Sequence, residues 1–104
     1  MSIFEVENKG KEMYSWANDL FPICRSITGP GVRETLSYIK NLINDLNIHE
    51  EPSGSKVFDW IIPEEWEVHE AWIEDNKGNK VIDFKKNNLH LVGYSEPVDI
   101  NLSL

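Results

Sequence analysis

The stretch CRSITGPGVRETLSYIKNLI, residues 24–43, decides the fold of the first part of the chain. Apolar side chains recur in it, and just beyond it, at intervals of four, three, four and three residues: Val32, Leu36, Ile39, Ile43 and Leu46. This spacing forms one apolar stripe of helical period, so it predicts an amphipathic helix. Gly29 and Pro30 fit an N-cap followed by proline at the first helical position. We expect Leu36 and Ile39 to be buried, so that Leu36→Ala destabilises by about 2 to 5 kcal/mol.

Another helix is expected earlier in the chain, over about residues 8–20, so the helix after Gly29 is the second of the two. Met13, Ala17 and Leu20 recur at i, i+4 and i+7 and form one face, and Pro22 ends the helical pattern. Ser2 and Glu5 have the spacing of a capping box, so an earlier first turn is an open alternative.

From residue 47 onward the hydrophobic period changes to two, which is typical of strands. The predicted strands are residues 48–50, 56–62, 66–73, 80–84 and 89–94, with a hairpin loop at residues 75–79 that contains Gly78. The predicted fold class is therefore α+β, with two N-terminal helices followed by a mostly antiparallel β-sheet of about four to five strands.

Composition excludes several classes of protein. The chain has 104 residues, and its 18 acidic residues against 10 basic ones give a net charge of −8. Nucleic acid is not an expected partner, because its binding requires a basic surface. Nor is a membrane, because no apolar run approaches the roughly 18 residues of a spanning helix. No secretion signal is visible, and Cys24 is the one cysteine, so we expect a cytoplasmic protein without an intramolecular disulfide.

The loop before the predicted second helix offers two chemical alternatives to a plain helix start. A phosphate cradle would need more glycines, and Pro30 removes one of the N–H donors. A nucleophilic Cys24 would need a base or a positive environment, and the neighbouring Arg25 side chain is expected to diverge from it. We therefore expect Cys24 to pack in the structure. Arg25 is expected to act as a tether, donating to loop carbonyls or to a carboxylate of the sheet.

Metal ligands and binding aromatics are the remaining candidates. His49, His69 and His90 each fall within a predicted strand, without the spacing of a known zinc motif. Three tryptophans of the strand region fit either a binding surface or the core of a small sheet, and we favour the core: Trp60, Trp66 and Trp72. The sequence thus assigns no catalytic, cofactor-binding or metal-binding residue.

Long motifs carry a family resemblance from about Tyr14 to the last residue. LFPICRSITGPGVRETLSYIKNL, KVFDWIIPEEWEVHEAWI and VIDFKKNNLHLVGYSEPVD resemble the N-terminal part of a family of bacterial aminopeptidase-like proteins, long described only as a domain of unknown function. This family resembles a branch of the co-catalytic zinc exopeptidases. Residues 25–29 and the Tyr38–Ile39 pair match the opening of such enzymes.

The resemblance implies a division of the chain and a function. Residues 1–50 would be the helical N-terminal segment of a peptidase-like domain, and residues 51–104 an incomplete portion of an inserted β-rich domain. The zinc ligands and the catalytic glutamate of such enzymes have no matching position here. The chain would be an N-terminal fragment of a zinc-dependent aminopeptidase-like hydrolase, inactive by itself, that binds no cofactor. Zinc and a peptide substrate would belong to the full-length protein.

Two further expectations follow. A fragment of this kind would expose apolar surface that the rest of the peptidase would cover, so self-association is expected. The alternative function is a non-catalytic protein- or carbohydrate-binding module that uses an aromatic sheet surface.

Overall fold

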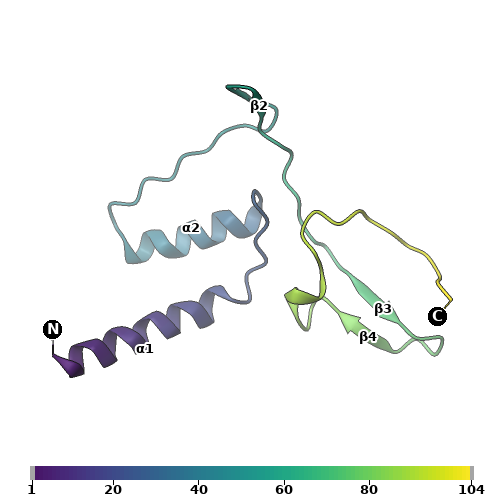
Figure 1. Ribbon diagram of the computed structural model, residues 1–104, viewed down its shortest axis with the longest axis horizontal. Coiled ribbons are helices and arrows are strands. Elements are labelled where there is room, and N and C mark those ends of the chain that lie inside the picture. The colour runs from purple at the N-terminus through teal and green to yellow at the C-terminus, as the bar shows by residue number, and fades with distance from the viewer. Residues whose placement is uncertain (1, 104) are drawn as a thin grey trace. The chain divides into compact units, whose positions relative to one another are not determined.

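The computed structural model describes residues 2–103. The chain divides into two compact units, Met1–Glu67 and Val68–Leu104. The first unit contains helices α1 and α2 and a small β-hairpin, and the second contains another hairpin and a short 3-10 helix (Figure 1). The boundary between these two units, after Glu67, is defined by how compactly the residues lie in space. The functional division at residue 50 stays a prediction.

Helix α1 spans Ile3–Leu20 and begins with the capping box that its sequence permits. The Ser2 backbone N–H donates to Glu5 Oε2 at 2.7 Å, and the Glu5 N–H donates to Ser2 Oγ at 3.2 Å. These bonds satisfy two N–H groups that a helix start otherwise leaves without partners. The extra first turn is therefore confirmed, and α1 begins five residues earlier than the apolar periodicity alone predicts.

Helix α2 spans Pro30–Leu42, with Gly29 as its N-cap and proline at the first position, as predicted. It ends before the apolar stripe does, because Ile43 takes an extended backbone with φ −126°. Gly31 is needed at the helix start: a Cβ there would lie 1.9 Å from the Cys24 carbonyl oxygen. The GPG sequence therefore lets the first turn of α2 close against the preceding loop.

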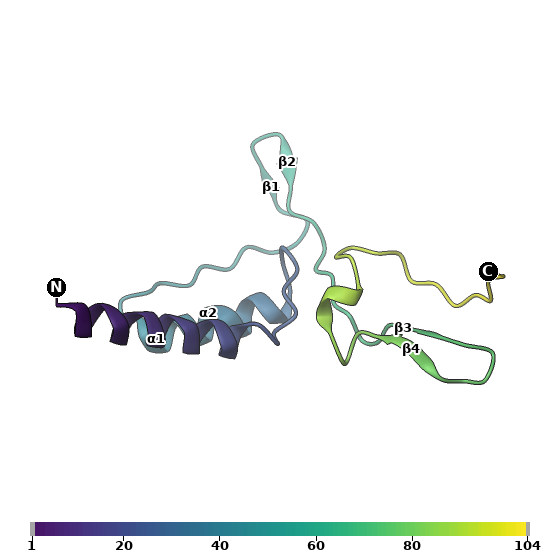
Figure 2. The same ribbon diagram turned by 60° about the horizontal axis from the view of Figure 1, so that its bottom comes forward.

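The two helices form an antiparallel pair within the first unit (Figures 1 and 2). The Tyr38 hydroxyl on α2 donates to Asp19 Oδ2 on α1 at 2.6 Å, and Trp16 and Leu20 of α1 are half-buried. Leu36 and Ile39 are also half-buried, so the prediction that both are buried is wrong. Neighbouring residues of this unit cover the apolar stripe only in part. The periodicity of the sequence shows which face of a helix can be buried, but it does not show whether another surface buries that face.

The first hairpin replaces a predicted strand. Strands β1, Lys56–Val57, and β2, Trp60–Ile61, pair antiparallel, with Val57 opposite Trp60. The sequence predicted one strand over residues 56–62. The chain instead reverses at Phe58, whose φ is +55°, in the left-handed region that a phenylalanine rarely takes.

The second hairpin follows its prediction more closely. Strands β3, Trp72–Glu74, and β4, Lys80–Asp83, pair antiparallel with a register shift after Ile73. Asp75 organises the connecting loop, because its Oδ1 accepts from the Lys77 and Asn79 backbone N–H groups, each at 2.9 Å. Gly78 takes φ +80° in this loop, as the sequence suggested.

The last predicted strand is a different element. Residues 88–90 form the 3-10 helix η1, Asn88–His90, whose Leu89 N–H donates to the Asn87 side chain at 3.0 Å. Residues 48–50 and 66–71 are not strands either. The α+β class, the two helices and the antiparallel pairing are confirmed, but the expected single sheet is two separate two-stranded sheets among the described residues.

No large apolar side chain among residues 2–103 is fully buried. The chain exposes 9333 Å², whereas the scaling relation for compact folded monomers gives about 6,000 Å² for a mass of 12.0 kDa. Isolated two-stranded sheets are marginal in water. Local bonds therefore hold the elements together more than a shared core does. Among residues 2–103, no helix combines the length and the apolar character that crossing a membrane requires.

Leu36→Ala should destabilise the helix pair by less than about 2 kcal/mol, the lower limit for burial in a complete core. The reason is that Leu36 is half-buried. Backbone amide exchange in α2 measures this locally, with Ser37→Ala, an exposed neighbour, as the control. A loss well above that limit would show that the stripe is covered more completely than the structure has it.

Candidate functional site

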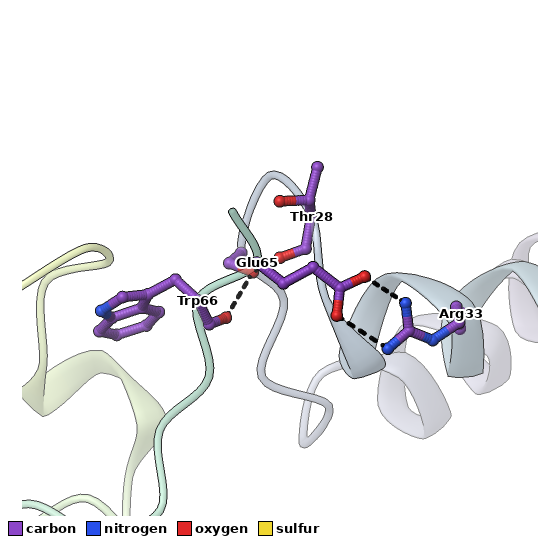
Figure 3. A network of polar contacts seen from close by, with 5 residues as sticks. Thr28, Arg33, Glu65 and Trp66 are labelled. Carbon is purple, nitrogen blue, oxygen red and sulfur yellow. Dashed lines mark hydrogen bonds and ion pairs between the residues drawn. The ribbon is translucent and has the colours of Figure 1, made fainter. Parts of the chain in front are cut away.

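A polar network joins the loop before α2 to the segment after β2, and we name it the loop clamp. It consists of Ser26, Arg33, Glu65 and the Trp66 carbonyl, and it brings together residues 32 and 40 positions apart in the sequence. Figure 3 shows Arg33 reaching from α2 toward Glu65, with Trp66 directed the other way. All four residues lie within the first unit.

The ion pair of the loop clamp is bidentate. Arg33 Nη2 donates to Glu65 Oε2 at 3.0 Å, and Arg33 Nη1 donates to Glu65 Oε1. The planar guanidinium matches two carboxylate oxygens in this way, which lysine cannot do. The pair holds the segment after β2 against the start of α2.

Ser26 supplies the second contact of the loop clamp. Its hydroxyl lies 2.9 Å from the Trp66 carbonyl oxygen and also contacts the Thr28 carbonyl oxygen. One hydroxyl carries one hydrogen, so the two carbonyls share a single donor. A side chain from the loop thereby holds backbone from beyond the first hairpin.

Gly29 is the residue that permits this approach. Its φ is +148°, and a Cβ would stand 3.0 Å from Ser26 Oγ and 3.2 Å from the Trp66 carbonyl oxygen. The backbone N–H groups of Val32 and Arg33 both donate to the Gly29 carbonyl. The glycine thus serves a close backbone contact, which favours the helix-start interpretation of this loop over a phosphate cradle.

Electrostatics follow the same contacts. The hydrogen bond from Arg33 lowers the pKa of Glu65 below its ordinary value of 4.5, and that bond raises the pKa of Arg33 in turn. The charges of Glu65, Glu50 and Glu67 add to the upward shift of the Arg33 pKa. Similarly, the hydrogen bond to Asp19 raises the pKa of Tyr38. Arg33 is therefore a cation among acids, and water screens its contacts because the pair is exposed.

Arg25 acts as the predicted tether, with carbonyl and hydroxyl acceptors. Its Nη1 lies 2.9 Å from the Leu20 carbonyl oxygen and 3.2 Å from Thr35 Oγ1. The Thr35 hydroxyl donates to the Gly31 carbonyl at 2.8 Å. Arg25 thus joins the end of α1 to the second turn of α2 through a helix carbonyl and a hydroxyl, and not through the loop carbonyls or the sheet carboxylate that were expected.

Cys24 is free and exposed, so the expectation that it packs is wrong. The Cys24 carbonyl oxygen lies close to Gly31, while the residue itself is exposed to solvent. Packing was expected because cysteine commonly behaves as a small apolar residue. A thiol reagent should reach it in the folded chain.

The three histidines are exposed, and residues 2–103 contain no group of three or more His, Cys, Asp or Glu side chains placed to hold a metal ion. His90 Nδ1 lies 3.2 Å from the Asp83 carbonyl oxygen. The described residues therefore do not fit a zinc site.

The tryptophans do not form the expected core. Trp60 is 57% exposed and Trp72 is 42% exposed, while Trp66 is half-buried beside the loop clamp. Lys80 Nζ stands 4.4 Å from the centroid of the Trp72 ring, a cation–π contact across the second hairpin. Sequence reasoning missed this contact and also Glu65. The opposite charges of residues 33 and 65 permit an ion pair, but nothing in the sequence indicates that Glu65 is the partner of Arg33.

Comparison with known proteins adds what the geometry alone does not supply. A family model described as a domain of unknown function, DUF4910, matches residues 14–98. A protein of Clostridium acetobutylicum named "Putative polysaccharide biosynthesis protein with aminopeptidase-like domain" is 54% identical over 95 residues, which are 91% of this chain and 22% of that protein.

A solved structure is also similar. The crystal structure of a "putative peptidase" from Clostridium acetobutylicum matches with a TM-score of 0.81 and 55% identity, over 88% of this chain and 21% of that one. The chain thus spans about a fifth of the length of these relatives.

Arg25→Lys should weaken the junction of α1 and α2, because an ammonium group cannot reproduce the donor geometry of the guanidinium. The thermal midpoint of the helical circular-dichroism signal should fall, whereas Lys40→Arg on α2 should leave it unchanged. An unaltered midpoint for Arg25→Lys would remove the tether.

The Arg33–Glu65 pair should open in acid. Because the folded-state pKa of Glu65 is lowered, the stabilisation is fully present above its ordinary value of 4.5 and is lost as the pH falls through the lowered pKa. The Arg33 Nε–Hε resonance followed by NMR should shift in that range. Glu65→Gln should abolish the shift, and Glu64→Gln, the matched control, should keep it. An identical titration in both variants would contradict the pairing.

Proposed function

The chain belongs to the family described as a domain of unknown function, DUF4910, and from that premise we propose that it forms the N-terminal part of a zinc-dependent aminopeptidase-like hydrolase. The observation that carries the proposal is the identity of 54–55% over about nine tenths of this chain with proteins named for an aminopeptidase-like domain and as a peptidase. In this proposal the chain is a cytoplasmic scaffold segment.

The chemistry would be supplied outside this segment. A zinc site in such an enzyme would activate water and polarise the peptide carbonyl. In this proposal the residues of this chain supply no zinc ligand, which is consistent with the absence of a ligand group among residues 2–103. Their role would be structural: the loop clamp and the Arg25 tether set the geometry of the loop and helix with which the hydrolase begins.

A second candidate is a binding module without catalysis. One observation favours it: Phe58 and Trp60 of the first hairpin are 93% and 57% exposed, as ligand-contacting aromatics are. Both similar proteins are named for a peptidase or an aminopeptidase-like domain, so this candidate stays second.

A chimera tests the proposal. The matching 95 residues of the Clostridium acetobutylicum relative are replaced by this chain, and hydrolysis of aminoacyl-anilides is compared with that of the unaltered relative. Hydrolysis by both proteins, lost with a chelator and restored by zinc, is the expected result. Absence of hydrolysis by the relative itself, at any metal loading, would overturn the proposed activity.

The 104-residue chain by itself should bind zinc weakly and leave aminoacyl-anilides uncleaved. Productive hydrolysis needs metal ligands and a general base in one place. Isothermal titration with zinc and a turnover assay check this. Chelator-sensitive turnover by the short chain would mean that the zinc ligands lie within it after all.

Self-association should increase with salt. Exposed apolar side chains favour contact between copies, whereas the net charge of −8 opposes it until salt screens the repulsion. Sedimentation velocity at low and high ionic strength measures the effect. A monomer at every salt concentration would contradict the proposal that the chain self-associates.

A further inference from the structure

The tip of the first hairpin combines exposure with backbone strain. Phe58 is 93% exposed and holds φ +55°. In a two-residue hairpin turn whose first residue alone has positive φ, glycine is the residue that fits without strain. A phenylalanine at this position keeps a large apolar group at the tip against the preference of the turn. Strain of this kind is a reason to look for function.

The apolar character continues along the hairpin. Trp60 stands opposite Val57, so these two side chains share one face, and Ile61 stands opposite Lys56 on the other. Ile61 is 61% exposed. The hairpin projects away from α1 and α2 in both views (Figures 1 and 2). We call Phe58 and Trp60 the hairpin tip.

The surroundings of the hairpin tip are acidic. Residues 48–67 contain six acids and one base, Lys56, a formal net charge of −5: Glu50, Glu51, Asp59, Glu64, Glu65 and Glu67. Such a surface repels nucleic acid and anionic lipid, and it repels a second copy of itself. A neutral polysaccharide offers no charge to match it. The complementary partner is a protein surface with an apolar pocket and a basic rim.

We propose that the hairpin tip docks into such a pocket on the part of an aminopeptidase-like protein that lies outside the matched region. The proposal rests on the proposed function, because about four fifths of each relative lies beyond the part that this chain matches. Phe58 would be the central anchor, the acids of residues 48–67 other than Glu65, which Arg33 pairs, would face the rim, and docking would order the hairpin.

Hydroxyl-radical footprinting with mass spectrometry tests the docking directly. Phe58 and Trp60 should be labelled almost as fast in the isolated chain as in the denatured chain, and severalfold more slowly in the chimera. Equal labelling in the isolated chain and in a folded chimera would overturn the proposal. If the chimera does not fold, residues 56–61 alone are grafted into the relative and labelled in the same way.

Controls separate the partners and the two proposals. Protection that grows with the concentration of the isolated chain would assign the tip to a second copy, and protection by added dextran would assign it to a carbohydrate; either result overturns the docking. Protection in a chimera that hydrolyses nothing would sustain the docking and count against the proposed activity. Hydrolysis by a chimera whose hairpin tip is labelled freely would support the proposed activity and count against the docking.

A pair of variants gives an independent readout. In the chimera, Phe58→Ser should speed amide exchange at Ile62, whose N–H donates to the Ser55 carbonyl at 3.0 Å, whereas Phe58→Leu, the matched apolar control, should change it less. In the isolated chain the two variants should behave alike, because the side chain is exposed there. The same result for both variants in the chimera would contradict an apolar anchor.

Discussion

The first unit depends on the ion pair between the Arg33 guanidinium and the Glu65 carboxylate, 32 residues further along the chain. After α2 ends at Leu42, the chain runs through more than twenty residues before it returns at Glu65. Arg33 and Ser26 hold that return, one through two carboxylate oxygens and the other through a backbone carbonyl. Gly29 leaves the space for it. Without these contacts the first hairpin would have no fixed direction relative to α2.

This anchoring is electrostatic and exposed, so water weakens it. The same holds for the Tyr38–Asp19 contact between the helices. The apolar side chains that ordinarily give a domain its stability are half-buried or exposed throughout residues 2–103. Local bonds thus specify the geometry of the segment, and the hydrolase proposed to contain it would supply the packing and exclude water from the loop clamp.

Local rules predicted the local elements well. The Ser2 and Glu5 capping box, the Gly29–Pro30 helix start and the Asp75 loop are each decided by a few neighbouring residues. The errors concern features that depend on distant partners. Leu36 and Cys24 were expected to be buried because their types are usually buried, but burial needs a second surface. Residues 56–62 are rich in the β-branched and aromatic residues that strands favour, and the reversal at Phe58 lies outside the usual turn chemistry.

The loop clamp was missed for a related reason. Arg33 and Glu65 are two ordinary surface charges in the sequence, and only the path of the chain brings them together. The long motifs identified the family because they combine many positions, each of which would be weak evidence for the family by itself.

The central claim is that this chain has local structure but no packed core of its own, and calorimetry tests it most directly. When a complete domain unfolds, its heat capacity rises by about 12–15 cal/mol/K per residue. We predict that the isolated, monomeric chain unfolds over a broad temperature range with a much smaller change, whereas the chimera unfolds cooperatively. A sharp two-state transition of the isolated monomer with the full heat-capacity change would contradict the claim.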